Sequence, residues 1–145
     1  MSTYSTEKLH KALQHFFGYD QFRLNQLPII ESVLAGRDTL AIMPTGAGKS
    51  ICFQLPAMLL PGITIVVSPL IALMKDQVDH LNNKGIPALF IHSGMTFMEV
   101  KKTLQQAAFD DYKFLYLSPE RIETKLFEEY LPALQPSLIA VDEAH

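Results

Sequence analysis

The chain has 145 residues, 48% of them apolar, with a formal net charge of −3 and a single cysteine. This length suits one domain with its own core, and the composition excludes a disordered, collagen-like or coiled-coil protein. One cysteine excludes an internal disulfide and a cysteine-based zinc site. No apolar run resembles a signal peptide or reaches the roughly 18 residues of a membrane span. We expect a soluble, cytoplasmic protein without a membrane partner, and the mild acidity argues against a nucleic-acid partner.

Two helices are predicted at the start of the chain. In residues 7–17 apolar side chains recur at helical spacing after Ser5 or the next residue as the cap, and Gly18 ends the segment. A second helix is predicted over residues 26–35, with Gly36 as its stop signal.

From residue 39 onward, short apolar runs alternate with helical stretches. The runs are nearly continuous rather than alternating, which is typical of strands covered on both faces. The predicted strands are 39–43, 63–67, 88–91, 113–117 and 138–141, and the predicted helices are 50–60, 72–83, 96–108 and 120–130. The third of these helices opens with a capping box at Thr96 and Glu99, and the fourth follows Ser118 as cap with Pro119 at its first position. This alternation predicts an α/β fold with a parallel sheet, whose strand-to-helix loops share one edge.

The segment Pro-Thr-Gly-Ala-Gly-Lys-Ser over residues 44–50 lies between the first predicted strand and its helix. Its glycines allow backbone N–H groups to surround phosphate oxygens, and the helix start favours the same anion. Lys49 adds a cation for the β- and γ-phosphates, and the Ser50 hydroxyl is a ligand for Mg²⁺. Met43 stands where the usual motif has its first glycine, so a glycine-rich turn with a chance Gly-Lys-Ser is the alternative. The strand before and the helix after favour nucleotide binding.

Two carboxylates, Asp142 and Glu143, follow the last predicted strand and so reach the same edge as the phosphate loop. An NTPase needs one carboxylate in the Mg²⁺ shell and a polar group that orients the attacking water. Asp142 fits the first role, and Glu143 fits the second as acceptor of the water proton. Alone, such a pair is more often a solvated strand end. Together with the phosphate loop it predicts NTP hydrolysis, with Lys49 and Glu143 as catalytic residues.

The final Asp-Glu-Ala-His resembles motif II of superfamily 2 helicases, and residues 43–50 resemble their motif I, which commonly lacks the first glycine. Further segments narrow the resemblance to the RecQ family of ATP-dependent DNA helicases. These segments are 13–26, similar to motif 0; 51–56, similar to the stretch after motif I; 68–78, similar to motif Ia; and 116–121, similar to a later Tyr-x-x-Pro-Glu motif. The resemblance runs from Leu13 to His145 in order and spacing. It departs at Leu24-Asn25, where Pro-Gly is frequent, and at Ala47, where glycine is common.

By this resemblance, residues 37–145 form a truncated first lobe of a RecA-like P-loop NTPase, preceded by an N-terminal helical region, 1–36. Tyr19 and Arg23 are implied to sandwich adenine while Gln26 hydrogen-bonds its edge, a chemistry that suits an amide and stacking planes. The implied ATP-binding residues are Tyr19, Arg23, Gln26, Thr45, Gly46, Ala47, Gly48, Lys49 and Ser50, and the implied Mg²⁺ ligands are Ser50 and Asp142. The resemblance makes Cys52 a small buried side chain without reactivity.

The resemblance also implies a DNA-binding face. Its residues are Ser68, Pro69, Leu70, Lys75, Ser93, Ser118, Pro119, Glu120 and Arg121. Two of these serines and the nearby helix starts can donate to phosphates without a basic patch, so the net charge of −3 no longer argues against DNA. Ordinary strand-to-helix turn chemistry is the alternative for the segments at Ser68 and Ser118.

The implied function is that of a 3′-to-5′ DNA helicase, which uses ATP and Mg²⁺ on single-stranded DNA and duplex junctions in repair and recombination, associated with a bacterial nucleoid. The family's core has two RecA-like lobes, so we expect this chain to hold most of the first and to need the second. By itself we expect it to bind nucleotide weakly and to unwind nothing. Two alternatives stay open: an RNA helicase of the DEAD or DEAH type, and a non-catalytic nucleotide-binding module.

Overall fold

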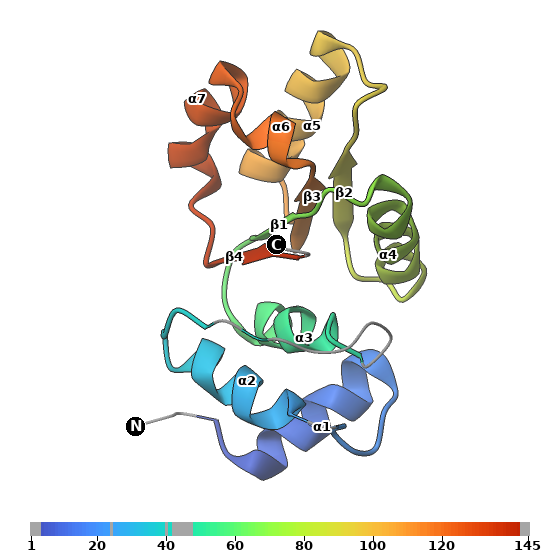
Figure 1. Ribbon diagram of the computed structural model, residues 1–145, viewed down its shortest axis with the longest axis vertical. Helices are drawn as coiled ribbons and strands as arrows, with labels where there is room; N and C mark the ends of the chain where they lie inside the picture. Colours follow the sequence, from blue (N-terminus) through green and yellow to red (C-terminus); the bar gives the residue numbers. More distant parts are fainter. Residues whose placement is uncertain (1–3, 24, 40, 42–47, 143–145) are drawn as a thin grey trace. The chain divides into compact units, whose positions relative to one another are not determined.

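The computed structural model describes residues 4–23, 25–39, 41 and 48–142. The chain divides into two compact units, which we call the N-terminal unit (Met1–Leu60) and the sheet unit (Pro61–His145) (Figure 1). The N-terminal unit contains α1 (Thr6–Phe17), α2 (Gln26–Leu34) and α3 (Ile51–Leu59). The sheet unit contains β1 (Thr64–Val67), α4 (Ile71–Asn83), β2 (Ala88–Ile91), α5 (Phe97–Phe109), β3 (Phe114–Leu117), α6 (Pro119–Ile122), α7 (Lys125–Leu134) and β4 (Leu138–Val141).

The N-terminal unit is held by the apolar face of α1 and by α3, which packs against both α1 and α2. Helix α1 begins where the Ser5 Oγ accepts a hydrogen bond from the Lys8 N–H, and it ends at Gly18, which has a φ of 77°. Its buried side chains include Leu9 and Leu13, which lie at helical spacing. The predicted cap, stop and apolar face of the first helix are therefore confirmed.

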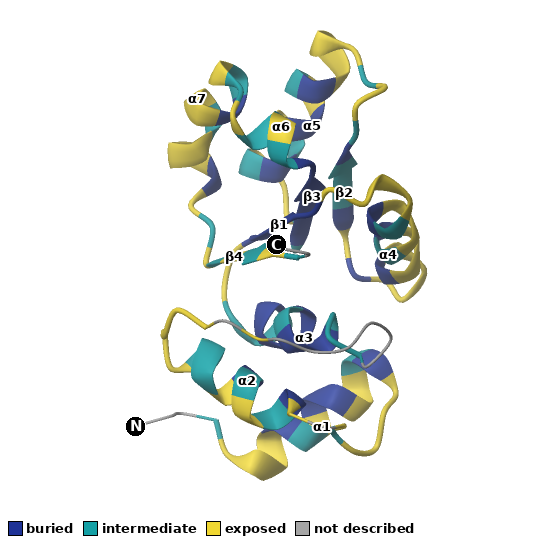
Figure 2. Ribbon diagram, in the orientation of Figure 1, coloured by how far each residue is buried: buried dark blue, intermediate teal, exposed yellow. Residues whose placement is uncertain are grey.

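The sheet unit is built on parallel strands. In the part of the chain that the structure describes, they form one four-stranded sheet in the order β2-β3-β1-β4. Every residue of β1 and β3 is buried, as the continuous apolar runs predict for strands covered on both faces. Helices α5 and α7 pack with one face of these strands in a common apolar cluster. On the opposite face, the Tyr116 hydroxyl of β3 donates to the Gln77 Oε1 of α4 at 2.8 Å. The prediction of a parallel sheet flanked by helices is confirmed (Figure 2).

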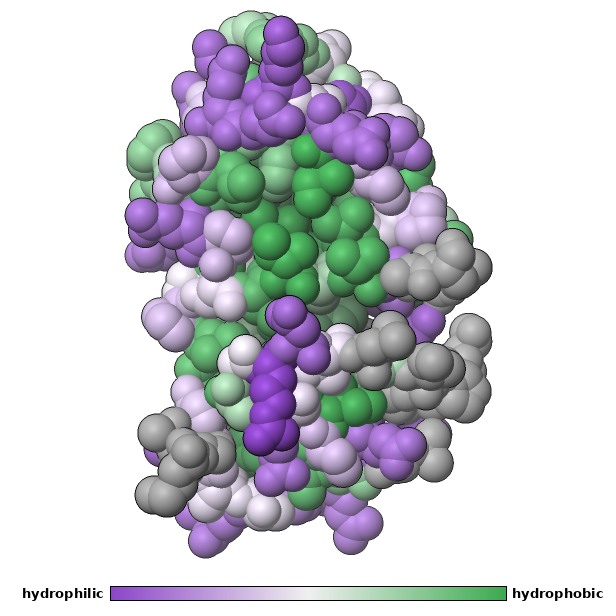
Figure 3. Space-filling model, turned by 60° about the vertical axis from the view of Figure 1, so that its left-hand side comes forward, coloured by the Kyte–Doolittle hydropathy of each residue, from purple (hydrophilic) through white to green (hydrophobic). Residues whose placement is uncertain are grey.

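Strand β4 differs from the central strands because its residues alternate in exposure. Ile139 is 51% exposed and Val141 is 61% exposed. Leu131 of α7 is a further exposed apolar side chain, and the view in Figure 3 shows a broad apolar area on the face that it brings forward. The prediction that both faces of this strand are covered is therefore wrong for its described residues.

The opposite edge strand, β2, is paired at its first residue by a side chain. The Asn82 Oδ1 of α4 accepts from the Ala88 N–H at 2.9 Å, and its Nδ2 donates to the Ala88 carbonyl at 3.1 Å. This amide reproduces the hydrogen bonds of a neighbouring strand. An edge strand that is covered in this way offers less unpaired backbone to other chains.

The single helix predicted over residues 120–130 is wrong, because the chain forms α6 and α7 with a break between them. Thr124 causes the break. Its hydroxyl donates to the Arg121 carbonyl at 2.7 Å and accepts from the Phe127 N–H at 3.3 Å, so it terminates one helix and caps the next. A threonine favours such a local cap over a helix interior.

The first predicted strand, 39–43, lies mostly outside the described residues. Its two described members, Thr39 and Ala41, are not in a strand. The predicted domain boundary after residue 36 stays a prediction, while α3 groups with the helices that precede it. Within the described ranges, no helix combines the length and apolar character that crossing a bilayer requires.

The predicted capping box at the start of α5 is confirmed, and it generates a stability prediction. The Thr96 Oγ1 accepts from the Glu99 N–H, and the Glu99 Oε1 accepts from the Thr96 N–H. We expect Thr96→Ala to lower the free energy of unfolding by about 1 kcal/mol, measured by urea denaturation at pH 7. Lys102→Ala, an exposed change on the same helix, is the control and should have little effect.

The same cap has a pH dependence. The Thr96 backbone N–H, and then its hydroxyl, lower the pKa of Glu99 below its usual 4.5. Because the folded state favours the carboxylate, this stabilisation is present above the usual pKa and is lost as the pH falls through the lowered one. The difference in stability between wild type and Glu99→Ala, which removes this carboxylate, should therefore shrink in acid, and a difference that grows there would contradict the cap.

Candidate nucleotide site and DNA-facing edge

A buried glutamine ties the described end of the phosphate loop to the start of α2. Gln26, which is 3% exposed, accepts at its Oε1 from the Arg23 N–H at 2.7 Å. Its Nε2 donates to the Gly48 carbonyl at 2.8 Å. The residue that the sequence predicts to contact adenine is therefore also a link between the predicted motif 0 and the predicted phosphate loop.

Gly48 has a backbone conformation that favours glycine, and it lies close to the Gln26 side chain. Its φ is +74°, and a Cβ at this position would lie 2.6 Å from the Gln26 Nε2. The chain then enters α3 at once, since the Ile51 N–H donates to the Gly48 carbonyl at 3.2 Å. The helix predicted after the phosphate loop is confirmed.

Lys49 and Ser50 form the turn that leads into α3, and both are half-buried. Ser50 occupies the N-cap position, yet its side chain makes no capping hydrogen bond to the helix. A helix start favours an anion, and a hydroxyl that does not cap its own helix suits a metal ligand. The chemistry of these described residues therefore fits a nucleotide phosphate with Mg²⁺.

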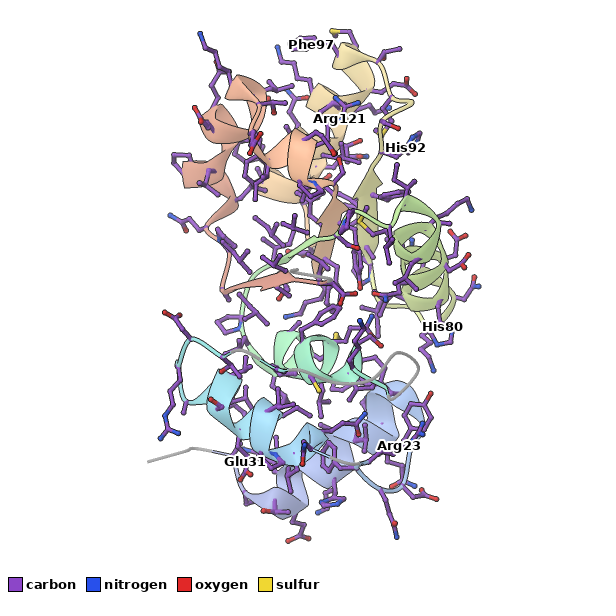
Figure 4. All side chains as sticks on the ribbon, viewed as in Figure 1. Arg23, Glu31, His80, His92, Phe97 and Arg121 are labelled. Atoms are coloured by element: carbon purple, nitrogen blue, oxygen red, sulfur yellow. The ribbon has the colours of Figure 1, made fainter. Side chains whose placement is uncertain are left out.

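The two residues predicted to sandwich adenine lie on the segment between α1 and α2. Tyr19 is 55% exposed, and Arg23, labelled in Figure 4, is also exposed. The Gln26 side chain fixes the Arg23 backbone. The side chains of Tyr19 and Arg23 both present surface on which a planar base can stack. The structure thus brings the predicted adenine-binding residues together in one unit.

Several predicted residues cannot be placed. Thr45, Gly46, Ala47 and Glu143 lie outside the described residues. Of the two predicted Mg²⁺ ligands, Ser50 belongs to the N-terminal unit and Asp142 to the sheet unit. The Asp142 N–H donates to the Val67 carbonyl at 2.8 Å, which places this carboxylate where β4 ends beside β1. The roles of these residues stay predictions.

The predicted DNA-binding residues come together at one edge of the sheet. They lie in the loops 68–70 and 92–96, which follow β1 and β2, in the segment 118–121, which follows β3 and enters α6, or at the start of α4 in the case of Lys75. Because these strands are parallel neighbours, the three segments share the edge at their carboxyl ends, which we call the carboxyl edge. The Lys75 Nζ is 2.8 Å from the Asp79 Oδ2, and this hydrogen bond raises the pKa of the lysine.

The two serines of the carboxyl edge are more enclosed than the sequence predicts. Ser68 is 2% exposed and Ser118 is 3% exposed. The Ser68 Oγ accepts from the Leu70 N–H at 3.2 Å, and the Ser118 hydroxyl lowers the pKa of Glu120 by hydrogen bonding. Both hydroxyls therefore serve their own turns, which is the alternative that the sequence left open. Direct phosphate contact by either one stays a prediction, while Pro69, Leu70, Ser93 and Glu120 are exposed.

Arg121 makes contacts that no sequence pattern indicates. Its Nη2 donates to the carbonyls of His92, Ser93 and Met95, at 3.1, 3.3 and 3.4 Å. The resemblance implies a DNA-binding arginine, whereas in the structure this group binds a neighbouring loop of the same edge.

The comparisons with known proteins identify the family of this chain. Residues 23–145 match the family described as DEAD/DEAH box helicase. The chain is 47% identical over 141 residues to the ATP-dependent DNA helicase RecQ of Synechocystis, covering 96% of this chain and 30% of that protein. It is 46% identical to RecQ of Bacillus subtilis, covering 94% of this chain and 24% of that protein.

A solved structure supports the fold. It is that of the DUF1998 helicase MrfA bound to DNA and AMPPNP, with a TM-score of 0.73 and 18% identity, covering 97% of this chain and 21% of that one. The predicted RecA-like helicase fold is confirmed. The chain spans less than a third of the length of each of these relatives.

The fit around Gly48 generates a stability prediction with a matched control. Gly36→Ala should lower the free energy of unfolding only by the cost of placing alanine in the left-handed region, about 1–2 kcal/mol. Gly36 has a φ of +79°, and a Cβ there would meet nothing within 4 Å. Gly48→Ala adds displacement of Gln26, so we expect it to lower the free energy of unfolding further than Gly36→Ala in urea titrations. Equal losses for both variants would contradict the close approach of Gln26.

Burial also generates a prediction for Cys52. Desolvation raises the pKa of this thiol from 9.0 to about 11, which supports the expectation of an unreactive cysteine. At pH 8 the thiolate fraction in the folded chain is about a hundredfold below that in the unfolded chain, and the thiolate is the reactive form. We expect an aromatic disulfide reagent to modify the folded protein about a hundredfold more slowly than the protein in denaturant. Similar rates would show that the thiol is accessible.

Proposed function

The chain belongs to the DEAD/DEAH box helicase family, and from that premise we propose that it forms the first lobe of a RecQ-type ATP-dependent DNA helicase with 3′-to-5′ polarity. The proposal for the whole protein extends beyond this chain, because the chain spans 30% of its Synechocystis relative. The similarity to RecQ proteins, which are ATP-dependent DNA helicases, supports DNA over RNA as the substrate. The substrates proposed are single-stranded DNA and duplex junctions.

The observation that carries the proposal is the link from Gln26 to Gly48 at 2.8 Å. It joins, in one unit, the segment with the exposed stacking side chains Tyr19 and Arg23 to the segment that leads into α3. A nucleotide has a planar base and an anionic phosphate chain, and these two segments match those two parts. The Gln26 amide also has a second N–H and a second oxygen lone pair with which to bind an adenine edge.

The remaining ATP-site roles follow from residue chemistry. Lys49 is proposed to neutralise the phosphates, Ser50 and Asp142 to hold Mg²⁺, and Glu143 to accept a proton from the attacking water. When bound, ATP would supply the phosphoanhydride bond whose hydrolysis releases free energy for translocation, and Mg²⁺ would neutralise charge on its phosphates. A second lobe is proposed to complete the site, since arginine fingers raise turnover by about 10³–10⁵ in other NTPases.

The carboxyl edge of the sheet unit supports the DNA part of the proposal. It collects exposed polar groups such as Ser93 and the starts of α4 and α5 on neighbouring loops. Backbone N–H groups and helix starts bind phosphate oxygens without a surplus of lysine and arginine. A net charge of −3 is therefore compatible with one side of a DNA track.

The adenine role of Gln26 can be tested by nucleotide preference. We expect Gln26→Ala to raise the KM for ATP about tenfold more than the KM for GTP, because it removes one or two hydrogen bonds to adenine, while loss of the tie to Gly48 affects both nucleotides alike. Steady-state hydrolysis by the full-length protein measures both. Gln14→Ala, an exposed glutamine of α1, is the matched control. Equal losses for ATP and GTP would mean that Gln26 acts on the phosphate loop alone and does not contact adenine.

The helicase activity itself can be tested on the full-length protein with matched duplexes that carry a 3′ or a 5′ single-stranded tail. We expect unwinding of the 3′-tailed DNA duplex and ATP hydrolysis that DNA stimulates. Lys49→Ala should abolish both, since it removes the cation proposed for the phosphates. Unwinding of RNA alone would favour the RNA helicase alternative, and no turnover at all would favour a non-catalytic nucleotide-binding module.

A further inference from the structure

We propose that Arg121 is a positioning residue, which fixes the loop after β2 so that this loop can contact the DNA backbone, and that Arg121 is not itself a phosphate ligand. This inference rests on the proposed DNA-binding function of the carboxyl edge. We call residues His92–Thr96 the β2–α5 loop. Arg121 lies on α6, which follows β3, and Figure 4 shows it beside His92 at the end of β2.

The contacts of Arg121 converge on one nitrogen. Its Nη2 lies 3.1 Å from the His92 carbonyl, 3.3 Å from the Ser93 carbonyl and 3.4 Å from the Met95 carbonyl. Three carbonyl dipoles that point to one spot repel each other unless a cation lies between them. A guanidinium supplies that charge with several N–H donors in a fixed plane. Arg121 therefore stabilises a loop conformation that the carbonyls alone would oppose.

The rest of the β2–α5 loop is closed by hydrogen bonds of its own. The Gly94 N–H donates to the His92 Nδ1 at 3.2 Å, and the His92 N–H donates to the Met95 Sδ at 3.4 Å. The Thr96 N–H is held by Glu99 in the capping box. With several N–H groups bound inside the loop and three carbonyls bound by Arg121, Ser93 and Gly94 remain exposed at its tip.

The backbone of Arg121 is fixed as firmly as its side chain. Its N–H donates to the Ser118 carbonyl at 3.1 Å, and its carbonyl accepts from the Thr124 hydroxyl at 2.7 Å. The break between α6 and α7 thus has a use, because Thr124 ends the short helix that directs Arg121 toward the neighbouring loop. Since β2 and β3 pair in parallel, with Ile91 opposite Leu117, their loops start side by side.

A positioning role and a phosphate-contact role predict different salt dependence. A side chain that neutralises a DNA phosphate releases a counterion. Its loss therefore makes the plot of log K for DNA binding against log salt concentration less steep, by about 0.7–0.9. A side chain that binds carbonyls within the protein releases none. Its loss weakens DNA binding at every salt concentration and leaves the slope unchanged.

The first measurement is amide hydrogen exchange of the β2–α5 loop without DNA. We expect Arg121→Gln to speed exchange of the Gly94 and Met95 amides at least tenfold, and Arg121→Lys to speed it less, because lysine keeps the charge but loses the planar fork. Lys125→Gln, which removes an exposed charge from α7, is the control and should leave exchange as in wild type. Unchanged exchange in Arg121→Gln would overturn the clamp.

The second measurement is single-stranded DNA affinity of the full-length protein across a salt series. We expect Arg121→Gln to weaken DNA binding several-fold. The slope of log K against log salt and the melting temperature of the protein should stay unchanged. A slope reduced by about 0.7 would identify a direct phosphate contact and overturn the proposal. If the wild type does not bind DNA, the proposed function fails and so does the DNA-positioning role, while hydrogen exchange still decides whether Arg121 fixes the loop.

Discussion

Parallel pairing of β1 with β3 and β4, and of β2 with β3, is the constraint on which the sheet unit depends. Parallel neighbours need a crossover between them. Each strand therefore ends at the same edge of the sheet, and the residues that follow it form a connection at that edge. The segments at 68–70, 92–96 and 118–121 are far apart in sequence, and they become neighbours only through this pairing. The buried apolar residues of β1 and β3 make the pairing favourable, because both faces are removed from water by helices.

The overall charge of the protein is a poor guide to its partner. A net charge of −3 argues against nucleic acid when it is spread evenly over a surface. The described basic side chains of the carboxyl edge are also engaged within the protein, with Lys75 bound to Asp79 and Arg121 bound to backbone carbonyls. In the proposed complex with DNA, the edge relies on local donors and helix starts, whose fields act over short distances and do not appear in a count of charges.

Local sequence signals predicted much of this fold. The cap at Ser5, the stop at Gly18 and the capping box at Thr96 are confirmed because each depends on residues at most four positions apart. The helix over 120–130 was wrong for a related reason: helical periodicity continues across Thr124, and only its hydrogen bonds to both sides reveal the break. The exposure of β4 was missed because an edge strand and a central strand can have the same apolar composition.

The long-range ties could not be predicted from the sequence. Gln26 binds Gly48, 22 residues away, and Arg121 binds His92, 29 residues away. In both, a side-chain donor binds carbonyls of a loop from another segment, so the loop conformation depends on a residue that the loop does not contain. A motif records which residues contact a ligand in a family, and it assigned both side chains to ligands. The structure shows that each binds backbone carbonyls of a loop from another segment. Such residues lose activity on substitution for two physical reasons, which only separate measurements of binding and loop order can distinguish.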